Sequence, residues 1–517
     1  MKKFNVTGVC IPELHYMADT SAKLKEIIKL VEEKSYFIIN RPRQYGKTTL
    51  LHLLRLELEK NQEYIIINLS FEGIGDTIFE NEENFSKSFL EMLSEKIKNN
   101  DLIKYLDEQK DKVNSIKLLS KSITQFIIKA QKKVILFIDE IDKSSNNQLF
   151  ISFLGMLRNK YLDRIQEGYD TFYSVILAGI HDVKTLKLKI RPDEERKYNS
   201  PWNIATDFKV DMSFNPKETE YMLRDYSKEK SVKMNISELS EKLFYYTSGY
   251  PFLVSRLCKI IDEDLLPNKD DKTWNTYDLE DAVNIILQES NTNFDDLIKN
   301  LENNDELYNK VHEIIIGGFS ANFNIDNPII KSGVTYGIFS RESGNLKIHN
   351  RIYEQRIYNY MSSKYETIEM ADYNYKDEFI ERQTLNLKKV LLKFQQFIKE
   401  NYSEKDKKFI EREGRLLFLS FIKPLINGEG YDFKEVTISN ERRIDIVITF
   451  RNKRYVVELK IWRGEKVHQK GLKQLSDYLD NYSLKQGYLL IYDFTKEKKY
   501  KSQNILFDNK NIFVVYI

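Results

Sequence analysis

The feature that most constrains the fold of this chain is an apolar strand that runs directly into Gly-Lys-Thr. The strand SYFIIN is followed by RPRQYGKTTLLHLL, which places Gly46, Lys47 and Thr48 at the start of a predicted helix. Backbone N–H groups at a helix N-terminus attract anions, a lysine there reaches phosphate oxygens, and a threonine hydroxyl binds Mg²⁺. The junction predicts a phosphate-binding loop, although Arg41 replaces its usual first glycine, and Arg41 and Arg43 could add positive charge. The alternative is a chance Gly-Lys-Thr before a helix.

A second strand supplies two acidic residues. VILFIDEID is an apolar run that ends in Asp139 and Glu140. Ligands of parallel α/β sheets bind at the carboxyl ends of the strands. Asp139 is therefore predicted to hold Mg²⁺ through water, and Glu140 to polarise an attacking water molecule. An acidic turn without a chemical role is the alternative.

Changes of pattern divide the chain into five segments, and the fold class is α/β and multidomain. Residues 1–212 alternate helices with the strands YFIIN, YIIINLSF, VILFIDEID, YSVILAGI and DFKVDMSF, as in a parallel sheet. Residues 213–295 are predicted to be helical, 296–365 mix helices with short strands, 366–390 form a polar linker, and 391–517 form a second α/β domain. The strands predicted in that last domain are 431–438, 443–450, 455–461 and 486–493.

The loop and the acidic strand end together resemble the additional-strand class of P-loop ATPases, close to the AAA-like and STAND-like ATPases. The resemblance implies a three-layer αβα core with strand order 5-1-4-3-2, a helical lid over residues 213–295, and ATP with Mg²⁺ as cofactors. Mg²⁺ contacts are implied for Thr48 and Asp139. The implied nucleotide contacts are Arg43, Gln44, Tyr45, Gly46, Lys47, Thr48, Thr49, Asp139 and Arg256.

Other features of the lid and its surroundings follow from the same resemblance. Arg256 follows a Gly-Tyr-Pro turn and is a candidate γ-phosphate sensor, the alternative being an exposed helix arginine. The fourth strand ends AGIHDV, without the Asn or Thr sensor of many relatives, so His181 or Asp182 would have to substitute. A winged-helix module commonly follows such lids, and residues 296–365 are identified with one. Such modules bind DNA or regulate, and no strongly basic helix here decides between the two roles.

Unexpected charges lie in the hairpin ERRIDIVITF-RNKR-YVVELKIW near the C-terminal end. With the turn centred on residues 452–453, Asp445 is predicted to pair with Lys460. Since side chains alternate along a strand and cross-strand partners share a face, Asp445, Glu458 and Lys460 should project from one face, opposite an apolar core face. Neighbouring carboxylates repel unless a cation joins them, which predicts a divalent metal site. The alternative is a solvated charged face with an Asp445–Lys460 ion pair.

Helices on both sides of the hairpin complete a pattern. KFIEREGRLLFLSFIKPLI places Glu413 on an apolar helix face, with Glu411 as the fallback, and HQKGLKQLSDYLDNY places Gln474 and Tyr478 one turn apart. The ensemble resembles the PD-(D/E)XK nuclease superfamily, particularly its RecB-like branch, and implies a restriction-endonuclease-like α/β/α domain. The implied roles are metal ligation by Asp445 and Glu458, water activation by Lys460, a helix acid at Glu413, and positioning by Gln474 and Tyr478.

The composition bears on whether the protein binds nucleic acid or a membrane. Lys and Arg total 80 against 78 Asp and Glu, so global charge does not indicate a nucleic-acid binder, although a local basic surface can exist. The sequence has no apolar stretch of membrane-spanning length, and Cys10 and Cys258 lack metal or disulfide spacing. A cytoplasmic protein without a membrane partner is expected.

The whole chain resembles a group of prokaryotic AAA-ATPase-like proteins with a C-terminal PD-(D/E)XK domain. The first hypothesis is an ATP-regulated, Mg²⁺-dependent nuclease that acts on nucleic acid, DNA being favoured over RNA, in defence against foreign DNA. A second is a signalling or DNA-binding ATPase whose nuclease-like domain only binds nucleic acid. A third is a loop that binds nucleotide without hydrolysing it, because its first glycine is missing. Assembly into a homo-oligomer stays open.

Overall fold

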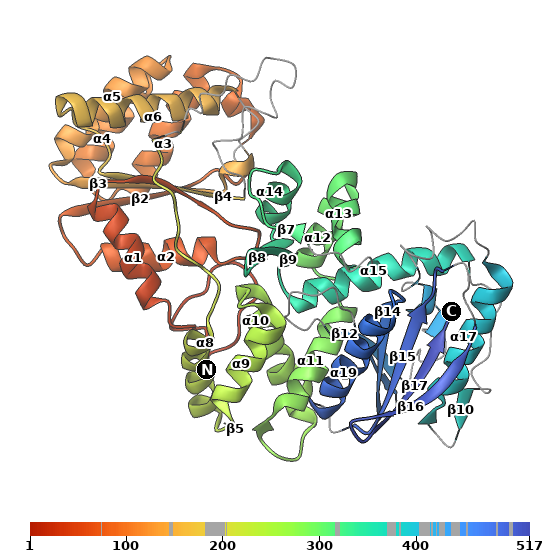
Figure 1. The fold of residues 1–517 in the computed structure, drawn as a ribbon. Helices are drawn as coiled ribbons and strands as arrows, with labels where there is room; N and C mark the ends of the chain where they lie inside the picture. Colours follow the sequence, from red (N-terminus) through yellow and green to blue (C-terminus); the bar gives the residue numbers. More distant parts are fainter. Residues whose placement is uncertain are drawn as a thin grey trace. The chain divides into compact units, whose positions relative to one another are not determined.

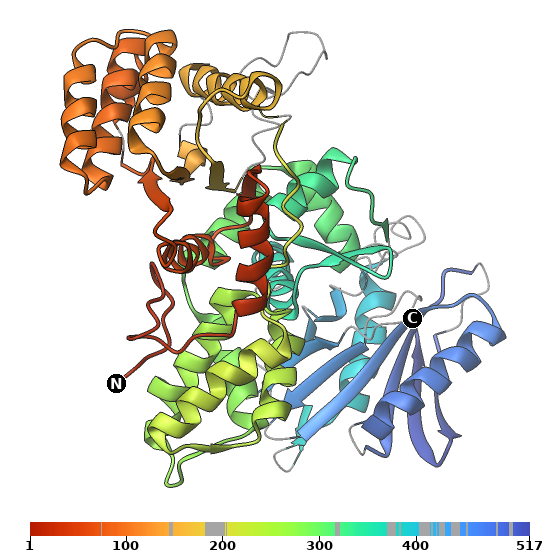
Figure 2. The same cartoon turned by 90° about the vertical axis from the view of Figure 1, so that its left-hand side faces the viewer.

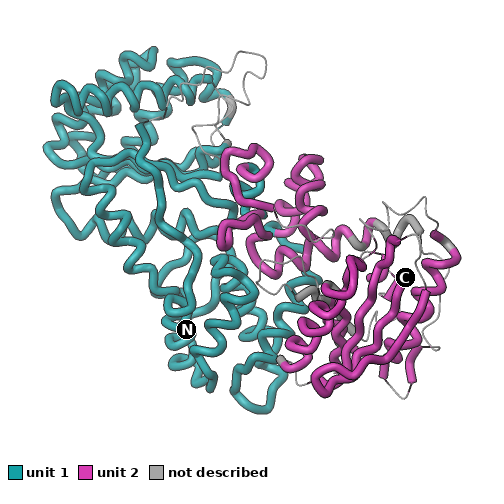
Figure 3. Tube along the Cα trace, viewed as in Figure 1, with its two compact units in different colours: residues 1–293, 332–338 teal, residues 294–331, 339–517 magenta. Residues whose placement is uncertain are grey.

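The chain forms two compact units, coloured separately in Figure 3. Unit 1 comprises residues 1–293 and 332–338, and unit 2 comprises residues 294–331 and 339–517. The computed structural model describes residues 1–517 except 74, 144–147, 181–201, 203, 316–320, 370–378, 382–383, 403–413, 415–416, 420, 423–429, 436–444, 451–452, 482–483 and 496–499.

Unit 1 is built on a parallel sheet with strand order β1-β4-β3-β2 (Figure 1). Its strands are β1 (Tyr36–Asn40), β2 (Tyr64–Ser70), β3 (Lys133–Asp139) and β4 (Ser174–Gly179). All four are apolar runs, as the sequence predicted; most side chains of β1, β3 and β4 are buried, whereas most of those of β2 are half-buried. Helices cover both faces of the sheet, so the predicted three-layer core is confirmed.

The predicted fifth strand, DFKVDMSF, is not formed. A single parallel bridge joins Thr206 to Phe37 on the free edge of β1, where the Thr206 N–H donates to the carbonyl of Tyr36 at 2.8 Å. The ladder stops there because Phe208 stacks on Phe37 and the carbonyl of Val210 accepts a hydrogen bond from the Arg41 side chain. The order of the four strands that form agrees with the implied order 5-1-4-3-2. In the place of the implied fifth strand, beside β1, the structure has only the bridge at Thr206.

Two layers of helices enclose this sheet (Figures 1 and 2). Helices α1 (Ser21–Glu32) and α2 (Lys47–Leu58) lie on one face. The other face is covered by α3 (Glu82–Lys96), α4 (Asn100–Lys110), α5 (Ile116–Ala130) and α6 (Gln148–Glu167). The main core cluster lies between this second layer and the sheet.

The region after the core is mainly helical, as predicted for the lid, and also holds two short parallel strands that were not predicted, β5 (Lys233–Met234) and β6 (Thr273–Trp274). It contains α8 (Pro216–Lys230), α9 (Ile236–Thr247), α10 (Pro251–Ile260) and α11 (Thr276–Gln288). Pro251 occupies the first turn of α10, where its missing N–H is not needed. Before it, Gly249 has φ +72°, and a Cβ there would lie 2.2 Å from the carbonyl oxygen of Phe214. The Gly-Tyr-Pro turn therefore begins a helix as expected, and only glycine fits its first position.

Unit 2 begins with short elements in the region predicted to mix helices and strands. They are α12 (Thr292–Glu302, whose first two residues belong to unit 1), α13 (Asp305–Ile315), β7 (Ala321–Asn322), α14 (Pro328–Thr335, which ends in unit 1), β8 (Phe339–Glu342), β9 (Asn345–Ile348) and α15 (Arg351–Glu369). The three strands form an antiparallel sheet in the order β7-β9-β8. The linker predicted at 366–390 was wrong in its described parts, which hold the end of α15, β10 (Ile380–Glu381), β11 (Thr384–Leu385) and the start of α17 (Leu387–Asn401).

The second α/β domain contains a six-stranded mixed sheet in the order β12-β13-β14-β15-β17-β16. Its strands are β12 (Gly430–Glu435), β13 (Asp445–Phe450), β14 (Lys453–Ile461), β15 (Gln486–Tyr492), β16 (Ser502–Phe507) and β17 (Lys510–Tyr516). The first three strands pair antiparallel, and β15 pairs parallel with β14 after the helix α19 (Glu465–Asn481). The last two strands were not predicted. In the described part of the chain, no helix is long and apolar enough to cross a membrane.

Candidate functional site

The phosphate-binding loop connects β1 to α2 in the way that the sequence predicted. Gly46 precedes the helix with φ +82°, and Gln44 also lies in the left-handed region at φ +55°. Strain of this kind costs about 1–2 kcal/mol for a non-glycine residue and clusters at functional sites. Lys47 is only 8 % exposed, and its Nζ donates to the carbonyl oxygens of Arg41 and Pro42, both at 2.9 Å. The loop therefore folds around a buried cation.

Three acidic residues lie close to that cation. Asp139 is buried at the end of β3 and accepts the N–H of Glu140, which has φ +56°. Burial and the Asp139 carboxylate raise the pKa of Glu140. Asp142 accepts the N–H of Ile180 at the end of β4. Burial lowers the pKa of Lys47, and the carboxylates of Asp142, Glu140 and Asp139 oppose that shift. The structure thus brings together the loop and the acidic strand end.

A cavity of about 320 Å³ adjoins the loop. One wall is the N-terminal segment, including Thr7; a second is the loop with α2, including Leu53; a third is the lid, including Phe252 and Ser255. Its lining is mostly apolar, and the Gln44 side chain reaches it from the loop. The cavity could not be predicted from the sequence, because its walls come from segments more than two hundred residues apart that share no local pattern.

The N-terminal wall is fixed in place at both ends. The N–H of Cys10 donates to Thr49 Oγ1 at 3.0 Å, so the Thr49 side chain is bound to protein. The ring of Phe4 packs against Tyr226 of the lid, with ring centroids 5.0 Å apart, and the Lys2 ammonium pairs with Asp225 at 2.8 Å. The segment therefore connects α2 to the lid.

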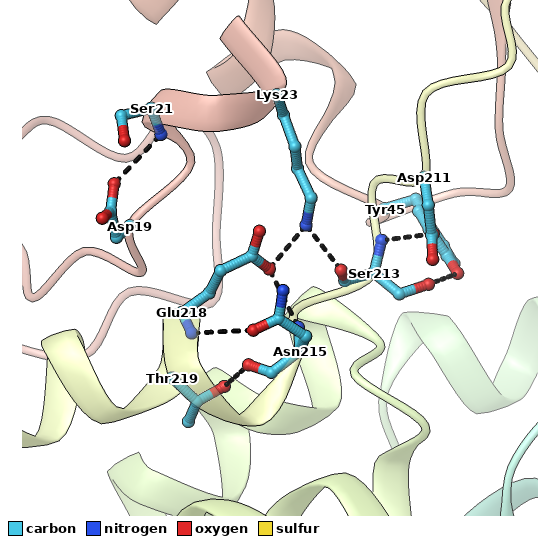
Figure 4. Close-up of polar contacts among 9 residues, drawn as sticks. All are labelled: Asp19, Ser21, Lys23, Tyr45, Asp211, Ser213, Asn215, Glu218 and Thr219. Carbon is cyan, nitrogen blue, oxygen red and sulfur yellow. Dashed lines mark hydrogen bonds and ion pairs between the residues drawn. The ribbon is translucent and has the colours of Figure 1, made fainter.

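A polar network joins the core to the lid beside the same cavity (Figure 4). Lys23 of α1 donates to the carbonyl oxygen of Ser213 and to Glu218, both at 2.6 Å. Glu218 also completes a capping box with Asn215 at the start of α8, and the Tyr45 hydroxyl lies 2.7 Å from Ser213 Oγ. The side chain of Tyr45 is buried and packs on Tyr250, so it is part of the core. The predicted contact of Tyr45 with nucleotide would therefore be made by its backbone.

The remaining predicted nucleotide residues differ in their placement. Arg43 and Thr48 are exposed at the loop. The guanidinium of Arg41 donates to the carbonyls of Asn40 and Val210, and its contribution of positive charge near phosphate stays a prediction. Arg256 forms a two-bond ion pair with Glu289 inside the lid, so its sensor role stays a prediction that requires this pair to open. The substitutes proposed for the fourth-strand sensor, His181 and Asp182, lie outside the described residues.

The predicted nuclease hairpin forms, but its register differs by two residues. The structure pairs Asp445 with Glu458 rather than with Lys460, and Phe450 with Lys453. A shift of two residues keeps every side chain on its face, because side chains alternate with a period of two. Glu458 and Lys460 thus share a face as predicted. The side chain of Asp445 and the whole of Glu413 and Glu411 lie outside the described residues.

The charged face is buried, which corrects the expectation that only the opposite face forms a core. Glu458 is 0 % exposed, and its Oε1 lies 2.6 Å from the Nζ of Lys460, whose side chain is 16 % exposed. The physical reason is that Val447 and Val456 share this face and pack under α19 through Leu472 and Leu475. A carboxylate without solvent contact is costly unless cations accompany it, and Lys460 is one such cation.

Helix α19 presents small and polar residues to this pair. A Cβ on Gly471 would lie 3.5 Å from Lys460 Cγ, so the helix runs close to the lysine stem. Gln474 and Tyr478 are buried one and two turns further along the same side. His468, which the sequence analysis missed, is buried on the first turns and lines a small cavity with Lys460. In the described part of the chain, no three His, Cys, Asp or Glu side chains cluster as a metal site.

Comparison with known proteins places the chain in a family. Residues 14–359 match the family described as "AAA-like domain". No curated protein matches the chain. Among solved structures, the Walker-type ATPase PABY2304 of Pyrococcus abyssi is 13 % identical and covers 68 % of this chain and 99 % of its own, with a TM-score of 0.46. The ORC2 protein of Aeropyrum pernix is 10 % identical and covers 70 % of this chain and 98 % of its own, with a TM-score of 0.42. RuvB of Thermotoga maritima is 15 % identical and covers 68 % of this chain and 98 % of its own, with a TM-score of 0.34. Since the family match spans well over half of the chain, this protein belongs to the AAA-like domain family and has a P-loop ATPase-like core.

Proposed function

We propose that unit 1 binds and hydrolyses ATP with Mg²⁺, and that unit 2 is a Mg²⁺-dependent nuclease controlled by that nucleotide. The observation that carries the first half is the buried Lys47, enclosed by its loop and facing three carboxylates beside a cavity. A buried ammonium whose partners are loop carbonyls can exchange them for the stronger acceptors of a phosphate.

The cavity suits the nucleoside part of ATP. Its volume of about 320 Å³ lies within the range of about 300–1,000 Å³ for ligand sites. Gln44 supports this fit, because its Oε1 is buried without a hydrogen-bond donor among the described residues, while its Nε2 donates to Thr292 at 3.1 Å. A ribose hydroxyl or a base amino group would supply the missing donor. Thr48 and Asp139 would hold Mg²⁺, which neutralises phosphate charge when bound, and Glu140 would orient the attacking water.

Two observations support the proposed nuclease activity of unit 2. Glu458 forms an ion pair with Lys460, and Asp445 lies opposite Glu458 on the neighbouring strand. The order of three antiparallel strands, a helix and a parallel strand supports a PD-(D/E)XK-like domain. Asp445 and Glu458 would hold Mg²⁺, whose bound water has a lowered pKa. Lys460 would hold the attacking water and stabilise negative charge on the scissile phosphate. Cleavage of DNA under nucleotide control would suit defence against foreign DNA.

An alternative is a regulatory ATPase whose second unit only binds nucleic acid. The observation in its favour is the ion pair itself, because Lys460 already partners the buried Glu458 and α19 covers the face. The three-stranded sheet β7-β9-β8 with α13 and α14 supports a winged-helix role for residues 296–365 in either case. Calorimetric titration with Mg²⁺ and Mn²⁺ discriminates, since a binding module should show no heat that depends on Asp445.

A basic stripe on α19 supports contact with nucleic acid. Lys466, Lys470 and Lys473 are exposed and follow the spacing of one helix side, and the exposed Arg463 precedes them. The three lysines span about 10 Å of helix at 1.5 Å per residue. That length matches about three nucleotides at 3.4 Å each. The stripe lies on the helix that passes Lys460, so a backbone bound to it would run beside the candidate nuclease site.

Changing the stripe lysines to glutamine is expected to weaken DNA binding and to flatten its salt dependence. The slope of log affinity against log salt should fall by about 2–3, at about 0.9 per lost phosphate contact. Fluorescence anisotropy with labelled duplex, single-stranded DNA and RNA at several salt concentrations measures this. The matched control changes Lys117, Lys121 and Lys129, which are exposed on α5 of unit 1. Equal slopes for both triple variants would show that the stripe does not bind nucleic acid.

Cleavage assays test the proposed function directly. The purified chain is incubated with linear and circular duplex DNA, single-stranded DNA and RNA, each with and without ATP and Mg²⁺. We expect Mg²⁺-dependent cleavage of at least one DNA substrate, at a rate that ATP changes severalfold. If no substrate is cut under any condition while ATP is hydrolysed, the nuclease half of the proposal fails and the binding-module alternative stands.

A further inference from the structure

The phosphate loop of unit 1 is held by residues outside itself. Its start is fixed by Arg41, whose N–H donates to the carbonyl of Gly179 at 3.1 Å and whose side chain donates to the carbonyls of Asn40 and Val210. A phosphate loop normally obtains its tight turn from a first glycine, which Arg41 replaces here. The shape of residues 42–45 must therefore come from neighbouring segments.

Tyr250 of the lid supplies two of these contacts. Its hydroxyl donates to the carbonyl of Arg43, and its ring meets the ring of Tyr45 edge-on, with centroids 4.6 Å apart. Tyr250 is 1 % exposed, so both contacts are shielded from water. Asn293 Nδ2 lies 3.5 Å from the same hydroxyl. One lid residue thus fixes a carbonyl and a side chain of the loop.

Gly337 supplies a third contact. It has φ +72°, and a Cβ there would lie 2.7 Å from Pro42 Cγ and 3.0 Å from Pro42 Cβ. Pro42 is itself buried. The turn at residue 337 therefore packs directly on the loop, and glycine is required both for its backbone conformation and for the close approach.

These contacts fall where the chain passes between the two units. The chain leaves unit 1 after Asn293, returns at Ser332 and leaves again after Ile338. Gln44 donates to Thr292, one residue from the first crossing, and Pro42 meets Gly337, one residue from the last. The loop therefore contacts residues that lie next to both covalent connections to unit 2.

We infer that Tyr250 and Gly337 are positioning residues for the phosphate loop, and that through them nucleotide binding is linked to the crossings that lead into α12 and β8. The inference deepens the proposed function and rests on its ATP-binding half. Linkage is reciprocal: if nucleotide favours one arrangement of these segments, that arrangement must in turn bind nucleotide more tightly than the others do. Nucleotide binding in unit 1 could in this way influence unit 2, the proposed nuclease, without any contact between the nucleotide site and the candidate catalytic residues.

Substitutions at the two positions test the inference. Tyr250→Phe keeps the ring and removes one hydroxyl, and should weaken binding of a fluorescent ATP analogue by about 2–13-fold, the effect of one hydrogen bond worth about 0.5–1.5 kcal/mol. Tyr221→Phe, an exposed tyrosine of α8, is the matched control and should bind as the unchanged protein. Gly337→Ala should weaken binding more, and adding Pro42→Ala should recover part of the loss, because it removes the Cγ atom that the new Cβ would meet.

Hydrogen exchange of the full chain reports the linkage itself. Adding ATP should change the exchange of residues 339–348, and this change should shrink in Tyr250→Phe and Gly337→Ala even at saturating nucleotide. The inference is overturned if ATP binds but leaves this exchange unchanged, or if both variants bind ATP as the unchanged protein does. If Gly337→Ala does not fold, Tyr250→Phe alone decides. If the unchanged protein binds no ATP, the proposed function fails and the inference fails with it.

Discussion

Changing Lys47 to alanine is expected to lower the affinity for ATP by about a hundredfold and to abolish its hydrolysis. The reason is that Lys47 Nζ is buried in the loop with two carbonyl partners, and charge-assisted hydrogen bonds to phosphate are worth about 1.5–3 kcal/mol each. Calorimetric titration with ATP and a phosphate-release assay measure the two effects. The sequence predicted this role from the Gly-Lys-Thr junction together with the acidic end of the strand at Asp139.

The control for Lys47 is Lys60→Ala, which removes an exposed lysine just beyond the same helix and should change neither quantity. Circular dichroism and the melting temperature check that Lys47→Ala remains folded. Without Lys47, the negative charges of Asp139, Glu140 and Asp142 lose a nearby positive charge. A modest loss of folding stability is therefore compatible with the prediction. ATP affinity equal to that of the unchanged protein would rule out Lys47 as the phosphate-binding lysine.

Changing Glu458 to glutamine is expected to reduce Mg²⁺-dependent cleavage at least about a hundredfold and to leave ATP turnover unchanged. The substitution keeps the shape of a side chain that is 0 % exposed but removes the charge that a hard divalent cation requires. It also removes the charged partner of Lys460, 2.6 Å away. Cleavage rates and calorimetric titration with Mn²⁺ measure the result.

The matched control for Glu458 is Glu465→Gln, an exposed acid at the start of α19. It should cleave and bind metal as the unchanged protein does. A Glu458→Gln protein that cuts at the normal rate would show that this carboxylate is not part of a nuclease centre. If the unchanged protein cuts no substrate and the Glu458→Gln protein gives the same heat with Mn²⁺ as the unchanged protein, the binding-module alternative is favoured instead.

Local sequence features predicted the parts of the fold that depend on neighbouring residues. The strands that end at Asn40 and Asp139 were predicted because each apolar run stops abruptly at its functional residues. The start of α10 was predicted from Pro251. The cavity was not, because it requires the N-terminal segment, α2 and the lid to meet, and nothing in the local pattern of Thr7 or Phe252 encodes that meeting.

The hairpin shows which part of a strand pairing a sequence determines. Alternation of side chains fixed the face shared by Glu458 and Lys460, but it cannot distinguish registers that differ by two residues, so Asp445 was assigned the wrong partner. Burial was misjudged for a related reason. A strand whose two faces are both covered has apolar residues in both sets of positions, and Val456 beside Glu458 was the available sign.

The N-terminal segment changes where the nucleotide-binding domain begins. The first helix of unit 1 starts at Ser21 and the family match starts at residue 14, so either would be a natural boundary. However, Thr7 and Cys10 line the cavity, and Lys2 and Phe4 attach the segment to the lid. A protein shortened to Ser21 would keep every strand and helix of the ATPase-like core but lose one wall of the cavity in which we propose that the nucleoside binds. An irregular segment that secondary structure alone would discard therefore completes the cavity.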